Sequence, residues 1–184
     1  MATPTKSKGS TKASSHRHTG EVARHSPSKT SQKNAIELLK ADHREVEQLF
    51  EEFEKSRSES KQRELARKIC LALKVHTQIE EEIFYPAFME ATEEEDIHHE
   101  AIVEHEGAKG LIAKIEKSSP EDDFYEAKVT VLSEMIKHHV NEEEKRGGMF
   151  AKAKEADMDL AALGEQLAER KQELMSTDGQ QLNS

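Results

Sequence analysis

The chain has 184 residues, a formal net charge of −10 and no tryptophan. It contains no apolar run that could span a membrane and no secretory signal at its start, so we expect neither membrane association nor export. A lone cysteine, Cys70, excludes an internal disulfide, which favours a cytoplasmic location. Lysine, glutamate, alanine and leucine dominate the composition, which predicts an all-α protein.

The first 33 residues differ from the rest in composition. They are rich in serine, threonine, lysine and histidine, and their seven lysines and arginines face a single glutamate. Such a segment cannot bury enough apolar surface to offset the entropy lost on ordering, so we predict a disordered basic tail over 1–33. The remainder of the chain is strongly acidic, which argues against a nucleic-acid partner.

From Asn34 onward, apolar residues recur at helical spacing, and Asn34 itself is typical of a helix N-cap. Pro86 is expected to end the second helix. Ser119 is expected to cap the fourth helix, with Pro120 at its first position. The pair Gly147–Gly148 breaks the pattern once more. We therefore expect helices over 34–55, 59–85, 93–117, 120–145 and 157–175.

Four amphipathic helices of similar length with short connections predict an up-down-up-down four-helix bundle. We assign the tail to 1–33, the bundle to 34–151, and an extra amphipathic helix with a frayed end to 152–184.

The apolar face of each bundle helix carries one histidine, and in two helices a glutamate follows one turn later. Burying so many ionisable groups unpaired would cost several kcal/mol each, whereas a shared metal centre compensates them. Imidazole and carboxylate donors suit iron, manganese or zinc, and six donors suit two ions better than one. The predicted metal ligands are His43, His76, Glu80, His105, His139 and Glu143.

Other polar residues are assigned different roles. If the register of the fourth helix slipped by one residue, His138 would replace His139, but His139 shares its face with apolar positions. His98 and His99 are out of phase with His105 and are interpreted as surface residues. Tyr85 and Tyr125 have two alternative roles: packing at a helix end, which we prefer, or hydrogen bonding or redox chemistry near the centre.

Four stretches of the chain resemble the hemerythrin-like, HHE cation-binding proteins. These stretches are LLKADHREVEQLF, HTQIEEEIFYP, EAIVEHEGAKGLI and the segment from HHVNEEE to MF. The resemblance covers about 35–151, and the later DLAALGEQLAERKQEL is similar to the tail helix of bacterial members.

The resemblance implies a bundle that holds two non-haem iron ions with an oxo or hydroxo bridge. It implies that His43 and His76 bind one iron, that His105 and His139 bind the other, and that two glutamates bridge the pair. The bridging residues would be Glu80 and Glu143.

The sequence departs from the family pattern in two places. Oxygen-carrying hemerythrins have a fifth histidine one turn from the one that matches His105, and here Ala101 and Lys109 stand at that spacing. We expect an open position there, filled by water or by a carboxylate such as Glu104. The second departure is KRGG after Glu144, which is expected to loosen the helix end near Glu143.

These observations favour a di-iron protein that binds or responds to oxygen, nitric oxide or peroxide, acting as a sensor, a scavenger or an oxygen binder. The alternatives are a di-iron enzyme that consumes peroxide or nitric oxide, an iron-donating repair protein, and a helical scaffold without metal. We find no separate catalytic motif in the sequence. A sensor of this size would need a protein partner.

Overall fold

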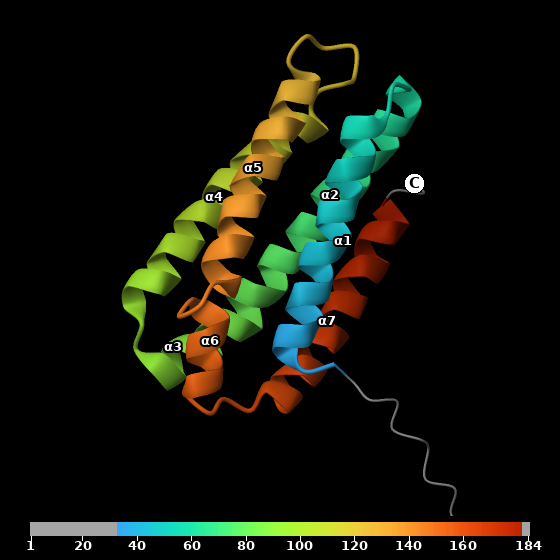
Figure 1. The fold of residues 1–184 in the computed structure, drawn as a ribbon. Coiled ribbons are helices and arrows are strands. Elements are labelled where there is room, and N and C mark those ends of the chain that lie inside the picture. The colour runs from blue at the N-terminus through green and yellow to red at the C-terminus, as the bar shows by residue number, and fades with distance from the viewer. Residues whose placement is uncertain (1–32, 182–184) are drawn as a thin grey trace, which may run out of the picture. The chain divides into compact units, whose positions relative to one another are not determined.

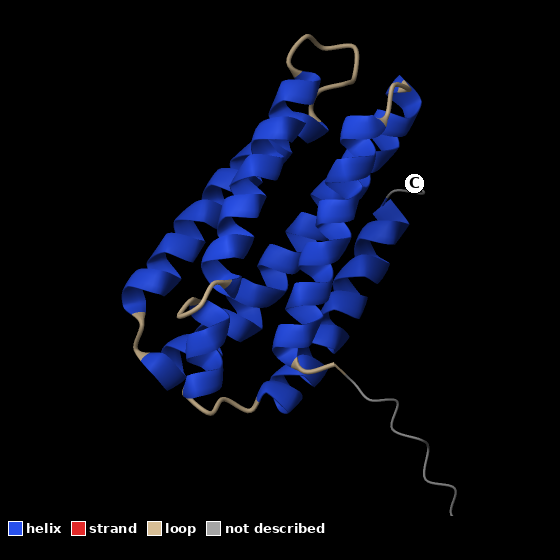
Figure 2. Ribbon diagram, in the orientation of Figure 1, coloured by secondary structure: helices blue, strands red, loops and turns tan. Residues whose placement is uncertain are grey.

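The computed structural model describes residues 33–181, and every regular element in that range is a helix (Figures 1 and 2). Its four main rods are α1 (Ala35–Lys55), α2 (Glu59–Ile79), α4 (Glu95–Glu116) and α5 (Tyr125–Glu144). This confirms the all-α bundle. The predicted tail over 1–33 lies almost wholly outside the described residues. No described helix has the length and hydropathy needed to cross a membrane.

Helix α1 begins with the cap predicted at Asn34. The Oδ1 atom of Asn34 accepts a hydrogen bond from the Glu37 backbone N–H at 3.0 Å, and the Glu37 carboxylate accepts one from the Asn34 N–H at 3.1 Å. This reciprocal pair satisfies two donors that a helix start leaves free, which fixes where α1 begins.

The second rod does not end at Pro86, as the sequence analysis expected. Helix α2 continues through a wide π-helical turn, η1 (Glu80–Phe84), into α3 (Tyr85–Thr92). The Tyr85 N–H donates to the Glu80 carbonyl, five residues back. Pro86 lies in the first turn of α3, and the widened turn lets the chain continue past a residue that has no N–H.

The later boundaries also differ from expectation. Ser119 and Asp122 form a turn in which the Ser119 N–H donates to Asp122 Oδ2 at 2.8 Å, so α5 begins only at Tyr125. After the break at Gly147–Gly148, a short helix α6 (Met149–Glu155) precedes α7 (Leu160–Gln181). Helix α7 lies against α1 and α2 (Figure 1).

Two apolar clusters fill the bundle, and a polar layer separates them. One cluster extends from Val46 to Phe53 on α1 and includes the facing residues of α2, α4 and α5. The other contains the start of α1 together with residues of α3, α6 and α7. Along α1, for example, Leu39 belongs to one cluster and Val46 to the other, with His43 between them. The core thus has its ionisable residues at one level.

Candidate metal centre

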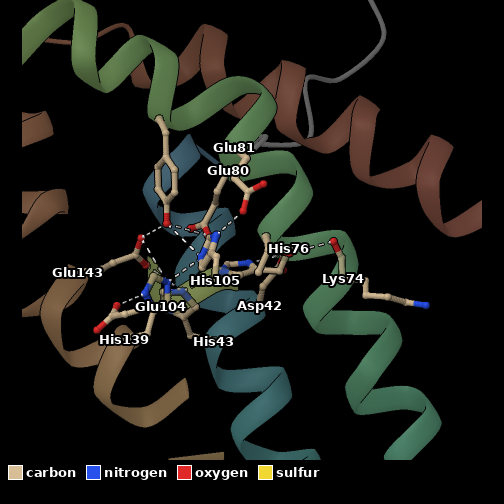
Figure 3. Close-up of polar contacts among 12 residues, drawn as sticks. Asp42, His43, Lys74, His76, Glu80, Glu81, Glu104, His105, His139 and Glu143 are labelled. Atoms are coloured by element: carbon tan, nitrogen blue, oxygen red, sulfur yellow. Dashed lines mark hydrogen bonds and ion pairs between the residues drawn. The ribbon is translucent and has the colours of Figure 1, made fainter. Parts of the chain in front are cut away.

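Four histidines meet in the polar layer, one from each main rod (Figure 3). The Nε2 atoms of His43 and His76 lie 3.1 Å apart, and those of His105 and His139 also lie 3.1 Å apart. None of the four is more than 6% exposed. The spacing of the apolar stripe produces this convergence, because each histidine replaces an apolar residue on the inward face of its helix.

Two buried glutamates connect the histidine pairs. Glu80 Oε2 lies 3.2 Å from His76 Nε2 and 3.4 Å from His105 Nε2. Glu143 Oε2 lies 3.3 Å from His43 Nε2, while its Oε1 lies 3.7 Å from His139 Nε2. Each carboxylate therefore reaches one histidine of either pair, which is the placement that bridging two ions requires. The structure thus brings together all six residues singled out in the sequence.

The donor atoms fall into two groups that share Glu80. One contains His43, His76, Glu80 and Glu143, and the other contains Glu80, His105 and His139. Within each group the donor atoms lie within 4.8 Å of one another.

Two buried carboxylate oxygens in this layer, Glu80 Oε1 and Glu143 Oε2, accept no hydrogen bond in good geometry. Burial alone would raise the pKa of Glu80, but the charges of His76 and the other imidazoles lower it to about 2. Burial would lower the pKa of His43, but its contacts with the carboxylates of Glu143 and Glu144 raise it to about 9. The layer thus favours the charged form of Glu80, and a cation fits the buried oxygens that lack a hydrogen-bond donor.

The outward-facing nitrogen of each histidine meets a second carboxylate, and of these four carboxylates the sequence had singled out only Glu104. His43 Nδ1 lies 2.8 Å from Glu144, His105 Nδ1 2.9 Å from Glu81, and His139 Nδ1 2.7 Å from Glu104. For His76 the partner is Asp42, at 3.6 Å. Such outer carboxylates fix the ring orientation and leave Nε2 free to bind a metal.

These outer carboxylates pair in turn with cations nearer the surface. Glu144 pairs with Lys40 and Arg44, and Lys109 pairs with Glu81. Asp42 pairs with Lys171 of α7 at 2.6 Å. The contact between Lys171 and Asp42 connects α7 to the carboxylate beside His76, a candidate metal ligand.

Tyr85 lies in the centre, contrary to the expectation that it packs at a helix end. Its hydroxyl lies 3.2 Å from both His105 Nε2 and Glu143 Oε1, and 3.5 Å from Glu80 Oε2. The side chain is fully buried, and burial followed by the charges of Glu80 and Glu143 raises its pKa well above the usual value. Tyr85 therefore offers a further oxygen to the group that contains His105 and His139. Tyr125, the first residue of α5, is also buried, in the apolar cluster that contains Val46 and Phe53.

The polar side chains next to the six residues differ in how far they are exposed. The side chain of His138 is 62% exposed, which supports the choice of His139. His99 is exposed, but His98 is half-buried with its ring 5.8 Å from that of Tyr85, so its assignment to the surface was wrong. Glu104 contacts the outer nitrogen of His139 and does not enter the layer between the Nε2 atoms.

The glycine pair after α5 forms a tight turn, whereas we expected a loosened helix end. Gly147 has φ +78°, and the Gly148 N–H donates to the Lys145 carbonyl at 2.9 Å. A Cβ atom at Gly148 would come within 2.2 Å of the Glu142 carbonyl oxygen and 2.9 Å of that of Glu143. The turn thus packs directly against the backbone that carries Glu143.

Two cavities reach the centre from different sides. The first, of about 140 Å³, lies between α1, α2, α5 and α7, is mainly apolar and touches His43, His76 and His139. The second, of about 200 Å³, lies between α4, α5 and the turn after α5, and touches His139 and Glu143.

Comparison with known proteins agrees with this architecture. The chain is 30% identical over 111 residues to a protein named DNA nickase from Nostoc sp. (strain PCC 7120 / SAG 25.82 / UTEX 2576); the match covers 60% of this chain and 31% of that protein. The chain thus spans about a third of that relative's length. Among solved structures, a hemerythrin HHE cation binding domain-containing protein from Mycobacterium kansasii superposes with a TM-score of 0.70. That match covers 83% of this chain and 93% of the other at 24% identity, and it shows a shared fold.

The model of the hemerythrin HHE cation binding domain matches residues 34–153, which include the four main rods and all six residues singled out above. This chain belongs to the hemerythrin HHE cation-binding domain family.

Proposed function

We propose that the chain holds two non-haem iron ions and uses them to bind or respond to oxygen, nitric oxide or peroxide. The observation that carries the proposal is the pair of histidine groups joined by Glu80 and Glu143. In this proposal His43 and His76 bind one iron, and His105 and His139 bind the other. The two glutamates bridge the ions, with an oxo or hydroxo group completing the bridge.

Iron is favoured by the chemistry of the donors. Four imidazoles and two carboxylates form a set of nitrogen and oxygen ligands with intermediate hardness, which suits iron better than calcium or magnesium. The family membership supports the same choice. The buried oxygens Glu80 Oε1 and Glu143 Oε2 accept no hydrogen bond in good geometry, which leaves their lone pairs available to a metal.

A small uncharged ligand is favoured by the first cavity. Val46, Leu49, Leu73 and Val75 are among its lining residues, and it reaches the rings of His43 and His76. Dioxygen and nitric oxide are small and apolar enough to enter such a space, whereas an anion would lose its hydration there. We do not carry over the activity named for the Nostoc relative, because this chain matches only 31% of that protein.

The test is aerobic purification followed by metal analysis and an optical spectrum. We expect about two irons per chain, as the two donor groups require, and near-ultraviolet charge-transfer bands. Reduction with dithionite and addition of oxygen, nitric oxide or peroxide then distinguishes the alternatives. A reversible spectral change supports ligand binding, whereas turnover supports the di-iron enzyme.

Two variants make this test specific. His76→Ala should abolish the bands, because it removes a proposed iron ligand. His99→Ala should leave them unchanged, because that side chain is exposed. A wild-type protein that binds no iron in the buried layer would contradict the proposal.

A further inference from the structure

The second cavity has more carboxylates in its lining than the first. It opens between α4 and α5 beside the Gly147–Gly148 turn, and its inner end reaches His139 and Glu143. Lys145, which pairs with Glu142, is the one basic residue among the cavity's described lining side chains apart from His139. The acidic lining residues are Glu100, Glu104, Glu142 and Glu143.

Beside this cavity, three side chains gather in a way that suits a cation. Glu100, Glu104 and His138 each place a donor atom within 4.8 Å of the other two. His138 Nε2 lies 3.1 Å from Glu104 Oε1. Glu100 and His138 are exposed and Glu104 is half-buried, so solvent would complete the coordination. Two carboxylates and one imidazole can bind ferrous iron, manganese or zinc, and an incomplete set of protein ligands releases the ion readily.

Glu104 connects this exposed group to the buried layer. Its Oε1 faces His138, while its Oε2 lies 2.7 Å from His139 Nδ1. At the inner end of the cavity, the Glu143 side chain is only 2% exposed, and its Oε2 has the His43 Nε2 atom 3.3 Å away but no hydrogen bond in good geometry. A buried carboxylate favours a cation beside it. Carboxylates therefore lie at both ends of the cavity, in the exposed group and at the buried centre.

A divalent ion that enters a buried site must lose water ligands. The two cavities differ in the number of carboxylates that could replace this water. The first cavity presents mainly apolar side chains, and its charged residues include both acids and lysines. The second presents carboxylates from its mouth to its inner end. Carboxylates along the path replace the lost water ligands and concentrate cations at the mouth.

We propose that Glu100, Glu104 and His138 form a transient divalent-cation site, and that iron enters and leaves the buried centre through the adjoining acidic cavity. This inference rests on the metal centre proposed above and adds the route by which that centre is filled. Because the site lies on the path and outside the final coordination, it changes the rates of uptake and release equally and leaves the final affinity unchanged.

The experiment compares metal exchange in the full chain and in the double variant Glu100→Gln/His138→Asn. Co²⁺ serves as the probe, because its visible bands report binding by nitrogen and oxygen donors. Uptake by metal-free protein is followed by stopped flow, and release from loaded protein is followed after addition of excess EDTA. We expect both rates to fall about tenfold, the lower end of what electrostatic focusing contributes to association, with an unchanged dissociation constant.

The matched control is Glu106→Gln/His99→Asn, which exchanges the same residue types at exposed positions outside the cavity. It should exchange Co²⁺ at the wild-type rate. Equal rates in the test variant and the wild type would overturn the inference while leaving the metal centre intact. A weaker final affinity with unchanged uptake would also overturn it, because it would make these residues supports of the bound ion. A wild-type protein whose buried layer never takes up Co²⁺ would overturn the proposed function as well.

Discussion

The two halves of the candidate centre use the same histidine–glutamate spacing in different surroundings. The half with His43 and His76 has four donors from the singled-out residues and adjoins the apolar cavity. The half with His105 and His139 has three such donors, is approached by the Tyr85 hydroxyl, and adjoins the acidic cavity. If both halves hold iron as proposed, the surroundings of each histidine pair, together with the ligands, decide which molecules can reach the metal.

The largest loss of bound iron is expected from substituting Glu80, the residue that the two halves share. Glu80→Ala removes a carboxylate that belongs to both donor groups, so both ions should be lost and the iron content should fall from about two per chain to near zero. His105→Ala should affect chiefly the second half and leave up to about one iron per chain. Elemental analysis measures both, with circular dichroism to verify folding. Wild-type iron content in Glu80→Ala would mean that the carboxylate does not hold the metals.

The loss of metal affinity on changing an outer carboxylate should be larger where that carboxylate lies closer to its histidine. Glu81→Gln removes the negative charge 2.9 Å from His105 Nδ1 and should weaken metal binding roughly 10–100-fold, the usual cost of changing such a support. Asp42→Asn alters a 3.6 Å contact with His76 and should cost only about threefold or less, because that pair is too far apart for a good hydrogen bond. Competition with a chelator of known affinity measures both variants. The reverse order would show that the first half depends more on its support than the distances indicate.

Removal of the Tyr85 hydroxyl tests whether this group obstructs ligand binding at the second half. Tyr85→Phe frees space beside His105 Nε2 and Glu143 Oε1, so an added anion such as azide should bind about tenfold more tightly, equivalent to ~1.4 kcal/mol. Iron content should stay unchanged. Optical titration with azide gives the affinity, and a titration curve identical to that of the wild type would rule out an obstructing role for this hydroxyl.

The smallest effect on the metals is expected at the turn behind the second half. Gly148→Ala forces a Cβ atom against the carbonyl oxygens of Glu142 and Glu143, and should lower the free energy of unfolding by about 2 kcal/mol. Gly110→Ala is the control, because nothing lies within 4 Å of its added carbon and alanine favours a helix by about 1 kcal/mol. Urea unfolding measures the two. Equal stability of both variants would show that the turn tolerates a side chain.

The sequence predicted the inward ligands because they follow the helical period. His43, for instance, lies seven residues after Ile36 and three before Val46, which are both core residues. The histidine at 139 could be preferred over that at 138 for the same reason. A regular period therefore determines which face of a helix carries the chemistry.

The outer carboxylates could not be predicted in this way, because they arise from contacts between helices. Glu144 is 101 residues from His43 in sequence, and nothing in either helix alone indicates that they meet. Tyr85 was missed for another reason. The wide turn η1 inserts one extra residue, which rotates all later side chains by about 100° relative to an uninterrupted α-helix. Pro86 inside a long apolar pattern was the signal that such a turn was present.

Anomalous diffraction at the iron edge from crystals of the iron-loaded chain would locate the metal ions directly. We expect two peaks within the layer of histidines, roughly 3.5 Å apart as in other paired-metal sites, one beside His43 and His76 and the other beside His105 and His139. A single peak, or peaks outside that layer, would contradict this expectation.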